Sequence, residues 1–252
     1  MNDNQERLIF EYLERVRSAN VEEISSATFC SPSTVRRRLN ALQEKGLVYR
    51  THGGAKINEN GAGFSDFSYR IDLNAIGKKQ IALEAIKLIK EGDTIFMDSS
   101  SSVYYMVKYL TEFKNIQVVT SGVDTLLLLG KNHVPSYSTG GRIDDKIRSK
   151  LVGPYAEKFV EDMHFDISFF SCKYVDTNGD LTEPNPDGNG LLRKVIKNSS
   201  KSVLLCDSDK FGMRTTFKVC NVSDIDYIIS DKNPNDFLTV NSMPKVLGNF
   251  ET

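Results

Sequence analysis

Residues 31–56 read SPSTVRRRLNALQEKGLVYRTHGGAK, and this stretch decides the fold of the amino-terminal region. It carries six Lys and Arg against a single Glu, whereas residues 1–30 carry three Arg against six Asp and Glu. The whole chain of 252 residues has a net charge of only −1, so the positive charge is concentrated in this stretch. A local excess of cations is typical of a surface that neutralises nucleic-acid phosphates.

A helix is predicted to begin at Pro32, because Ser31 is a preferred N-cap and proline is favoured in the first helical turn. Gly46 readily adopts the left-handed backbone conformation that ends many helices, so this helix is predicted to stop there. Between them one apolar stripe recurs at helical spacing. The stripe consists of Val35, Leu39 and Leu42. At about 100° per residue, Ser33 and Arg37 lie about 160° from the start of the stripe and point away from the core.

Two further helices are predicted upstream, over residues 5–16 and near residues 21–27, because apolar residues repeat there on one helical face. Downstream, LVYRTHGGAK is predicted to form two short strands joined at Gly53-Gly54. A short helix, a tight turn, a cationic helix and a hairpin are the pattern of a winged helix-turn-helix domain, whose second helix enters the major groove of DNA. An arginine run alone fits a solvated helix face equally well, but its combination with the turn, the helix cap and the hairpin favours DNA binding.

Within this domain, which we place at residues 1–56, Ser33 and Arg37 are expected to read base edges. Arg36, Arg38, Arg50 and Lys56 are expected mainly to neutralise phosphates. The candidate DNA-binding residues are Ser31, Ser33, Thr34, Arg36, Arg37, Arg38, Arg50, His52, Gly53, Gly54 and Lys56.

Residues 57–73 are predicted to be a linker, and residues 74–252 a second, larger domain. Apolar strand patterns such as DTIFMD, IQVVTS, DISFFSC and SVLLCDS alternate there with helical patterns. This alternation predicts an α/β fold of the Rossmann-like kind, with a mostly parallel sheet covered by helices on both faces. Ligands of such sheets bind outside the carboxyl ends of the strands.

Small polar and basic residues follow five of the predicted strands. Asp98 is followed by four serines directly before a helix, an arrangement suited to holding an anion. A serine run alone suits a helix cap equally well, but like chemistry at several strand ends favours a binding site. The candidate ligand-binding residues are Asp98, Ser99, Ser100, Ser101, Ser102, Thr120, Ser121, Gly140, Gly141, Arg142, Lys173, Asp207 and Lys210.

Several classes of protein are disfavoured by what the sequence lacks. No GxxxxGK or GxGxxG motif is present, so no nucleotide cofactor is expected. The four cysteines stand far apart without metal-ligand spacing, so we expect free thiols in a reducing cytoplasm and no metal site. No apolar run approaches the roughly 20 residues of a membrane span.

The run STVRRRLNALQEKGLVYRTHGGA resembles the signature of the DeoR family of bacterial transcriptional regulators, and FMDSSSSVYYM, STGGRI, LVGPYAEKF and CDSDKFG resemble later elements of that family. The resemblance implies a carboxy-terminal sensor domain, related to ribose-phosphate isomerases, that binds a phosphorylated sugar as effector. It also implies a homodimer or homotetramer. The chain departs from the family pattern at Arg38, where the family has Asp, and at Ser100, Ser121 and Tyr174 near the expected effector site.

The expected function is therefore a DNA-binding regulator, a repressor of a carbohydrate-utilisation operon that a sugar phosphate releases from its double-stranded operator. One alternative is a sugar-phosphate isomerase or deaminase with an accessory DNA-binding module. Such an enzyme needs a general base near its pocket, for which Asp98, Asp207 and Asp209 are candidates, although cap or ligand-binding roles suit them as well. Another alternative is an operator-binding protein without a small effector. We expect no catalytic residues.

Overall fold

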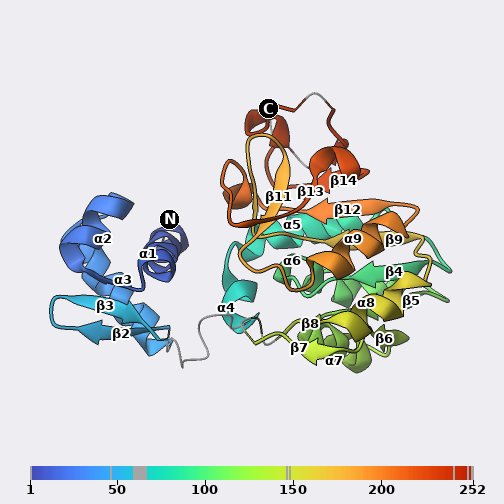
Figure 1. Ribbon diagram of the computed structural model, residues 1–252, viewed down its shortest axis with the longest axis horizontal. Helices are drawn as coiled ribbons and strands as arrows, with labels where there is room; N and C mark the ends of the chain where they lie inside the picture. Colours follow the sequence, from blue (N-terminus) through green and yellow to red (C-terminus); the bar gives the residue numbers. More distant parts are fainter. Residues whose placement is uncertain are drawn as a thin grey trace. The chain divides into compact units, whose positions relative to one another are not determined.

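The computed structural model describes residues 2–45, 47–58, 67–145, 147, 149–240, 242–248 and 250 (Figure 1). Its backbone contacts divide the chain into two compact units. Residues 1–73 form most of the amino-terminal unit, and residues 74–145 and 149–252 form the carboxy-terminal unit. No helix among the described residues is long and apolar enough to cross a membrane.

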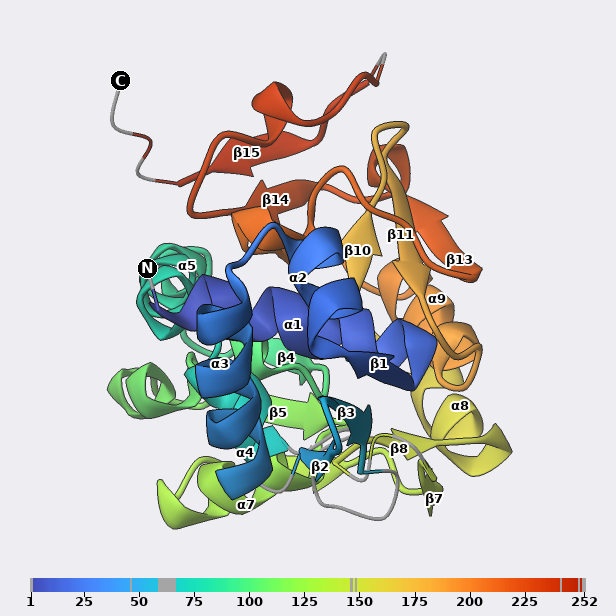
Figure 2. The ribbon, with the colours of Figure 1, turned by 90° about the vertical axis from the view of Figure 1, so that its left-hand side faces the viewer.

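The described residues of the amino-terminal unit form three helices and a three-stranded sheet, followed by a short fourth helix. Its elements are α1 (Asn2–Val16), β1 (Ser18–Asn20), α2 (Val21–Thr28), α3 (Pro32–Glu44), β2 (Val48–Thr51), β3 (Gly54–Ile57) and α4 (Phe67–Asp72). β3 lies between β1 and β2 and is antiparallel to both. Figure 2 shows α3 leading into the β2–β3 hairpin, which we call the wing.

The helical stripe predicted for α3 is confirmed, because Val35, Leu39 and Leu42 are fully buried. They pack in one cluster with apolar residues of α1, α2, β1 and the wing. Ser31 is the N-cap of α3 and Pro32 its first residue, as predicted. The predicted helix end at Gly46 lies outside the described residues.

The carboxy-terminal unit is built around a seven-stranded parallel sheet, in the order β15-β14-β12-β9-β4-β5-β6. Its strands are β4 (Thr94–Met97), β5 (Gln117–Thr120), β6 (Ser136–Ser138), β9 (Ile167–Phe170), β12 (Ser202–Leu205), β14 (Tyr227–Ile229) and β15 (Lys245–Leu247). The prediction of an α/β fold with a mostly parallel sheet is confirmed.

Helices cover both faces of this sheet. The helices of the unit are α5 (Ala75–Ile86), α6 (Ser101–Tyr104), α7 (Val123–Lys131), α8 (Pro154–Glu161) and α9 (Asn189–Lys197), with 3₁₀ turns η2 (Val107–Glu112), η3 (Ser208–Lys210), η4 (Val222–Asp224) and η5 (Pro234–Asp236). Because side chains alternate along a strand, Ile95 packs in the cluster of α5, α6 and α7, while Phe96 packs with α8 and α9.

A smaller antiparallel sheet, which the sequence reading missed, joins this core. It contains β10 (Tyr174–Val175), β11 (Asp180–Glu183) and β13 (Phe217–Asn221) in that order. β7 (Arg142–Ile143) and β8 (Leu151–Val152) form a separate two-stranded pair. These strands are short and half-polar, so they lack the continuous apolar run by which the parallel strands were predicted.

The residues predicted to be a linker are not all irregular. Ile57 ends β3 and is buried in the core of the amino-terminal unit, and residues 67–72 form α4. Glycine and asparagine in this segment suggested loop structure, but a helix as short as α4 shows too little periodicity to be recognised.

Candidate DNA interface and effector site

The exposed face of α3 presents two arginines and two serines. Ser31, Ser33, Arg36 and Arg37 are exposed, whereas Thr34 is half-buried. The backbone N–H of Thr34 donates to Ser31 Oγ at 3.3 Å, and Ser31 Oγ donates to Thr34 Oγ1 at 2.9 Å. Ser31 and Thr34 therefore cap the helix, and Ser33 and Arg37 remain the outward side chains best placed to meet base edges.

Arg38 does not share this exposure. Only 8% of its surface is exposed, and it is grouped with the buried residues of α3. Its position near the edge of the apolar stripe suggested a flanking cation, but a side chain so buried has no path to a phosphate in this conformation. We therefore leave Arg38 out of the interface.

The wing adds further polar side chains beside its glycine turn. His52 and Lys56 are exposed and Arg50 is half-buried. The Lys56 ammonium lies 5.8 Å from the centre of the Tyr49 ring, which supports it by a cation–π contact. Arg50 Nη1 is buried without a hydrogen-bond partner among the described residues. Lys56 is therefore the better exposed of these two cations.

Glycine is required at positions 53 and 54 for two different structural reasons. Gly53 has φ +84°, a left-handed conformation that disfavours any side chain. A Cβ on Gly54 would overlap the backbone carbonyl oxygen of Ala19, which belongs to the neighbouring strand β1. Gly54 therefore serves the β1–β3 pairing, and its predicted place in a DNA contact is not needed to explain it.

The parallel strands bring most of the predicted ligand-binding residues to one edge of the large sheet, which we call the carboxyl edge. It comprises residues 98–102 after β4, the last residue of β5 with residues 121–122 after it, 139–141 after β6, 171–173 after β9 and 206–210 after β12. The loops after β4 and β5 touch, because a Cβ on Gly122 would lie 2.9 Å from Thr125 Oγ1 and 3.0 Å from Ser99 Cα.

Asp98 is committed to holding this edge together. Its two carboxylate oxygens accept hydrogen bonds of 2.8 Å each from the backbone N–H groups of Ser100 and Ser171. Burial raises the pKa of Asp98, although these hydrogen bonds and the charge of Lys150 oppose that shift. Each oxygen thus accepts one backbone N–H, so Asp98 organises the loops after β4 and β9.

The serines after β4 divide into a cap and buried hydroxyls. Ser100 is the N-cap of α6, with its Oγ accepting from Val103 N at 3.3 Å. Ser99, Ser101 and Ser102 are buried. The hydroxyls of Ser102 and Thr125 are buried without a hydrogen-bond partner among the described residues. Thr120 Oγ1 accepts from Gly122 N at 3.0 Å, so Thr120 shapes the neighbouring loop.

Lys210, in the loop after β12, contacts polar groups of its own loop and of the loop after the neighbouring strand β9. Its ammonium donates to Ser171 Oγ at 2.8 Å and lies 3.6 Å from a carboxylate oxygen of Asp207. Burial alone would favour the neutral amine, but the nearby carboxylates of Asp207 and Asp98 help to outweigh it, and the pKa of Lys210 is raised. The edge therefore presents a fixed, charged ammonium.

Three residues of this site were missed by sequence reasoning: Lys150, Ser171 and Glu183. Glu183 Oε1 accepts from the backbone N–H of Lys173 at 2.9 Å. Burial raises the pKa of Glu183 against the opposing charges of Lys150 and Lys210, which places all three groups within electrostatic reach. Ser171 lies at the end of the predicted strand DISFFSC, so its place at a strand end was a signal that could have identified it as a site residue. Lys150 directly precedes β8 and Glu183 ends β11, and the sequence pattern predicted neither strand.

Glycine also makes room for Lys150. Gly188 has φ +87°, and a Cβ there would lie 2.8 Å from Lys150 Nζ. That ammonium donates to the carbonyl oxygen of Asp187 at 3.0 Å. The segment before α9 therefore fixes this second lysine beside the site.

The remaining predicted residues lie towards the rim of the site. Arg142 is exposed and forms an ion pair of 2.8 Å with Asp187. The Lys173 ammonium lies 5.3 Å from the centre of the Tyr174 ring. Gly140 and Gly141 both have positive φ, and a Cβ on Gly141 would lie 2.5 Å from the carbonyl oxygen of Val152. These glycines shape the turn from β6 into β7.

The cysteines are free thiols, three of them buried. Contact with the Cys206 thiol, together with burial, raises the pKa of Cys172 well above its ordinary value. Burial raises the pKa of Cys220 to about 12. Such thiols are unreactive at neutral pH. Among the described residues, no group of three or more His, Cys, Asp or Glu could hold a metal ion.

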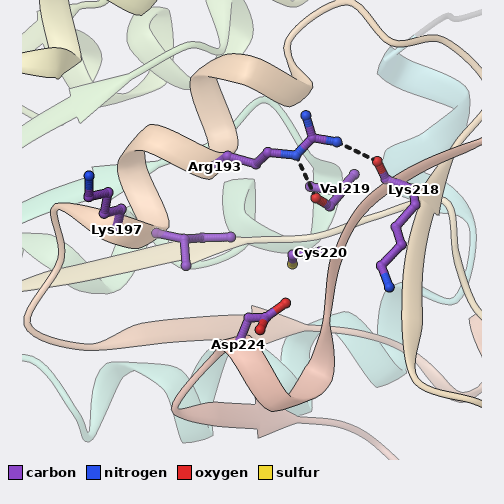
Figure 3. A pocket seen from close by; sticks show the side chains of 7 residues that line it. Arg193, Lys197, Lys218, Val219, Cys220 and Asp224 are labelled. Carbon is purple, nitrogen blue, oxygen red and sulfur yellow. Dashed lines mark hydrogen bonds between the residues drawn. The ribbon is translucent and has the colours of Figure 1, made fainter.

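A separate cavity of about 540 Å³ lies between α9 and β13 (Figure 3). The Arg193 guanidinium, which lines it, donates to the backbone carbonyl oxygens of Val219 and Lys218 at 2.7 Å each. The Lys218 ammonium pairs with Asp180. Arg193 and Lys218 are thus already engaged, and none of the predicted ligand-binding residues lines the cavity.

Comparison with known proteins agrees with this architecture. A family model described as "DeoR-like helix-turn-helix domain" matches residues 6–61, and one described as "DeoR C terminal sensor domain" matches residues 73–232. Among solved structures, a D-ribose-5-phosphate isomerase in complex with phospho-erythronic acid is 19% identical, with a TM-score of 0.40 over 53% of this chain and 52% of that chain. A likeness so distant carries no argument about function.

Several transcriptional regulators are similar to this chain along most of their length. The L-fucose operon activator of Haemophilus influenzae is 33% identical over 93% of this chain and 94% of its own. The transcriptional regulator GolR of Listeria innocua is 33% identical over 91% of each chain. The glycerol-3-phosphate regulon repressor of Haemophilus influenzae is 26% identical over 90% of this chain and 88% of its own. With a winged helix-turn-helix unit, a parallel-sheet sensor unit and these matches, the chain belongs to the DeoR family of transcriptional regulators.

Proposed function

We propose that this regulator binds a phosphorylated sugar at the carboxyl edge of its parallel sheet, and that the bound ligand changes its affinity for operator DNA. The observation that carries the proposal is the position of Lys210, whose ammonium is fixed by Ser171 and Asp207 beside the serine loop after β4. Relatives named for an L-fucose operon and a glycerol-3-phosphate regulon support a ligand of this class.

The site chemistry suits both ends of such a ligand. A phosphate would accept a charge-assisted hydrogen bond from Lys210, with Lys150 as a second cation nearby. The buried, unpartnered hydroxyls of Ser102 and Thr125 would gain partners from a ligand that reaches them. Glu183, with one oxygen not occupied by Lys173, is suited to accept from a sugar hydroxyl.

On the DNA side, we propose that Ser33 and Arg37 contact base edges and that Arg36, Arg50, His52 and Lys56 contact phosphates. One winged helix-turn-helix domain covers too little DNA to specify a site in a genome. We therefore propose that the protein binds repeated half-sites as a homodimer or homotetramer. We place this action in the cytoplasm. We propose repression of a carbohydrate operon as its action, although relatives include a named activator as well as a named repressor.

A thermal-shift screen tests the effector proposal. The full chain is heated with aldose and ketose phosphates of three to six carbons, glycerol 3-phosphate, the unphosphorylated parents and inorganic phosphate. A ligand at 100 times its Kd stabilises the folded state by about 2.7 kcal/mol, which is readily seen as a rise in Tm. A phosphorylated sugar should raise Tm while its parent does not. If no sugar phosphate raises Tm, a regulator without a small effector is favoured.

One observation favours a second function, sugar-phosphate isomerisation. Burial raises the pKa of Glu183 and thereby makes it a better general base than an ordinary carboxylate, beside the cation Lys210. Interconversion of aldose and ketose phosphates, followed by a spectroscopic assay, separates the two functions. We expect no turnover; turnover that Glu183→Gln abolishes would establish the enzyme.

A further inference from the structure

Phe29 has two unfavourable features at once. It is 97% exposed, the most exposed large apolar side chain among the described residues. It also adopts φ 54°, ψ 26°, the left-handed conformation that residues other than glycine and asparagine rarely adopt. A strained backbone that persists at an exposed aromatic points to a function for that side chain.

The turn that carries Phe29 is held firmly by its neighbours. Ser25 Oγ donates to the carbonyl oxygen of Cys30 at 2.5 Å, and Thr28 Oγ1 donates to that of Ile24 at 2.7 Å. Cys30 and Ile24 are both buried in the core of the amino-terminal unit. The left-handed conformation is therefore imposed by the turn between α2 and α3, and the phenyl ring is held out into solvent.

The position of Phe29 in the chain identifies what it can contact. It precedes Ser31, the N-cap of α3, by two residues, a distance of at most about 8 Å along the backbone. In a helix-turn-helix, the first residues of the second helix are those that enter the major groove. The exposed residues Pro32 and Ser33 belong to that first turn. An aromatic ring here adjoins the surface that DNA covers.

We propose that Phe29 makes an apolar contact with operator DNA at the edge of the groove entered by α3, against a deoxyribose or a thymine methyl group. Phenylalanine has no hydrogen-bonding group, and these are the apolar parts of DNA available to it. The inference rests on the proposed interface of α3. The contact buries a ring that is otherwise fully hydrated, which explains why a strained aromatic stands where glycine would fold more easily.

Two glycine variants separate a DNA contact from a folding role. Phe29→Gly relieves the strained backbone and removes the ring. His133→Gly is the matched control, because His133 has φ 57° in the turn after α7 of the other unit. Both variants should raise Tm. Operator duplex is first selected from a random pool by the full-length wild type, and affinity is then measured by fluorescence anisotropy.

Phe29→Gly should lower operator affinity by roughly five- to tenfold, in line with loss of one good base-edge or apolar contact, whereas His133→Gly should leave it unchanged. Phe29→Leu should retain part of the affinity. A Phe29→Gly variant that binds as tightly as the wild type would overturn the inference. Failure of the wild type to select any sequence would instead refute the proposed DNA interface itself.

Uracil substitution distinguishes the two apolar surfaces of DNA. If Phe29 touches a methyl group, replacing one particular thymine weakens the wild type and has no effect on Phe29→Gly. If no thymine behaves in this way while Phe29→Gly still binds weakly, the contact is to deoxyribose. Loss of affinity for the full operator but not for a single half-site would show that Phe29 contacts a second copy of the chain, and would contradict the proposal.

Discussion

The ammonium of Lys210 donates a 2.8 Å hydrogen bond to the hydroxyl of Ser171, and this contact joins the loops that follow β12 and β9. Ser171 also donates its backbone N–H to Asp98 and its hydroxyl to the carbonyl oxygen of Leu205 at 2.6 Å. Three neighbouring strands thus hold the lysine in one place. A preorganised cation of this kind loses little freedom when an anion binds.

Glu183 should reduce the stability of the protein at neutral pH. Burial raises its pKa above the ordinary 4.5, so folding favours the protonated form. That favourable contribution is present below the unfolded pKa and is lost as pH rises through the folded pKa. Glu183→Gln should therefore raise the free energy of unfolding at pH 7, with a difference from wild type that vanishes near pH 4, as measured by urea denaturation at each pH.

Asp180, on the same strand, provides a control of opposite sign. Burial opposes its ionisation, but hydrogen bonds from Lys218 and Asn221 prevail and lower its pKa. The stability that ionised Asp180 contributes is present above its unfolded pKa and is lost as pH falls through its folded pKa. Asp180→Asn should destabilise the protein at pH 7. If Glu183→Gln also destabilises it there, attraction to Lys150 and Lys210 outweighs burial and the assigned pKa direction is wrong.

Arg37 and Arg36 are adjacent, exposed and of equal charge, yet they should behave differently. Arg37 lies opposite the buried stripe, so Arg37→Ala should cost about 1–3 kcal/mol on the operator and relax preference at one base pair. Arg36→Ala should weaken binding to all sequences and reduce the slope of log affinity against log salt by roughly one unit. Binding titrations on single-base operator variants at several salt concentrations measure both. If Arg37→Ala lost the same affinity on every DNA sequence, Arg37 would contact only phosphate.

The two glycines of the wing should differ in stability. Gly53→Ala places a side chain at φ +84° with open space around it and should cost about 1–2 kcal/mol. Gly54→Ala drives a Cβ into the Ala19 carbonyl and should cost more, because β1 must separate from β3. Thermal unfolding followed at the amino-terminal unit compares them. A milder effect at Gly54 would mean that β1 moves away without penalty.

The sequence was sufficient wherever one local pattern dominated. The stripe of α3, its Ser31 cap and the long apolar strands were predicted correctly because periodicity and capping depend on neighbours in the chain. Arg38 was misjudged because helical angle alone does not say how far the core extends around a helix. Lys150 and Glu183 were missed because only tertiary packing of β11 and of the segment before β8 brings them near Lys210. β8 is only two residues long and β11 is half polar, so neither strand stands out in the sequence.

The central claim is tested most directly by DNA release with a single lysine changed. Operator affinity of the wild type, Lys210→Ala and Lys218→Ala is measured by fluorescence anisotropy with and without each sugar phosphate and its unphosphorylated parent. Lys218 is the control, because it pairs with Asp180 away from the carboxyl edge.

One sugar phosphate should change the operator affinity of the wild type and of Lys218→Ala by about 5- to 150-fold, which is the usual range of coupling between two sites, while its parent has no effect. Lys210→Ala should bind the operator normally and show no response. A normal response from Lys210→Ala, or no response of the wild type to any sugar phosphate, would contradict the assignment of the effector site to this edge of the sheet.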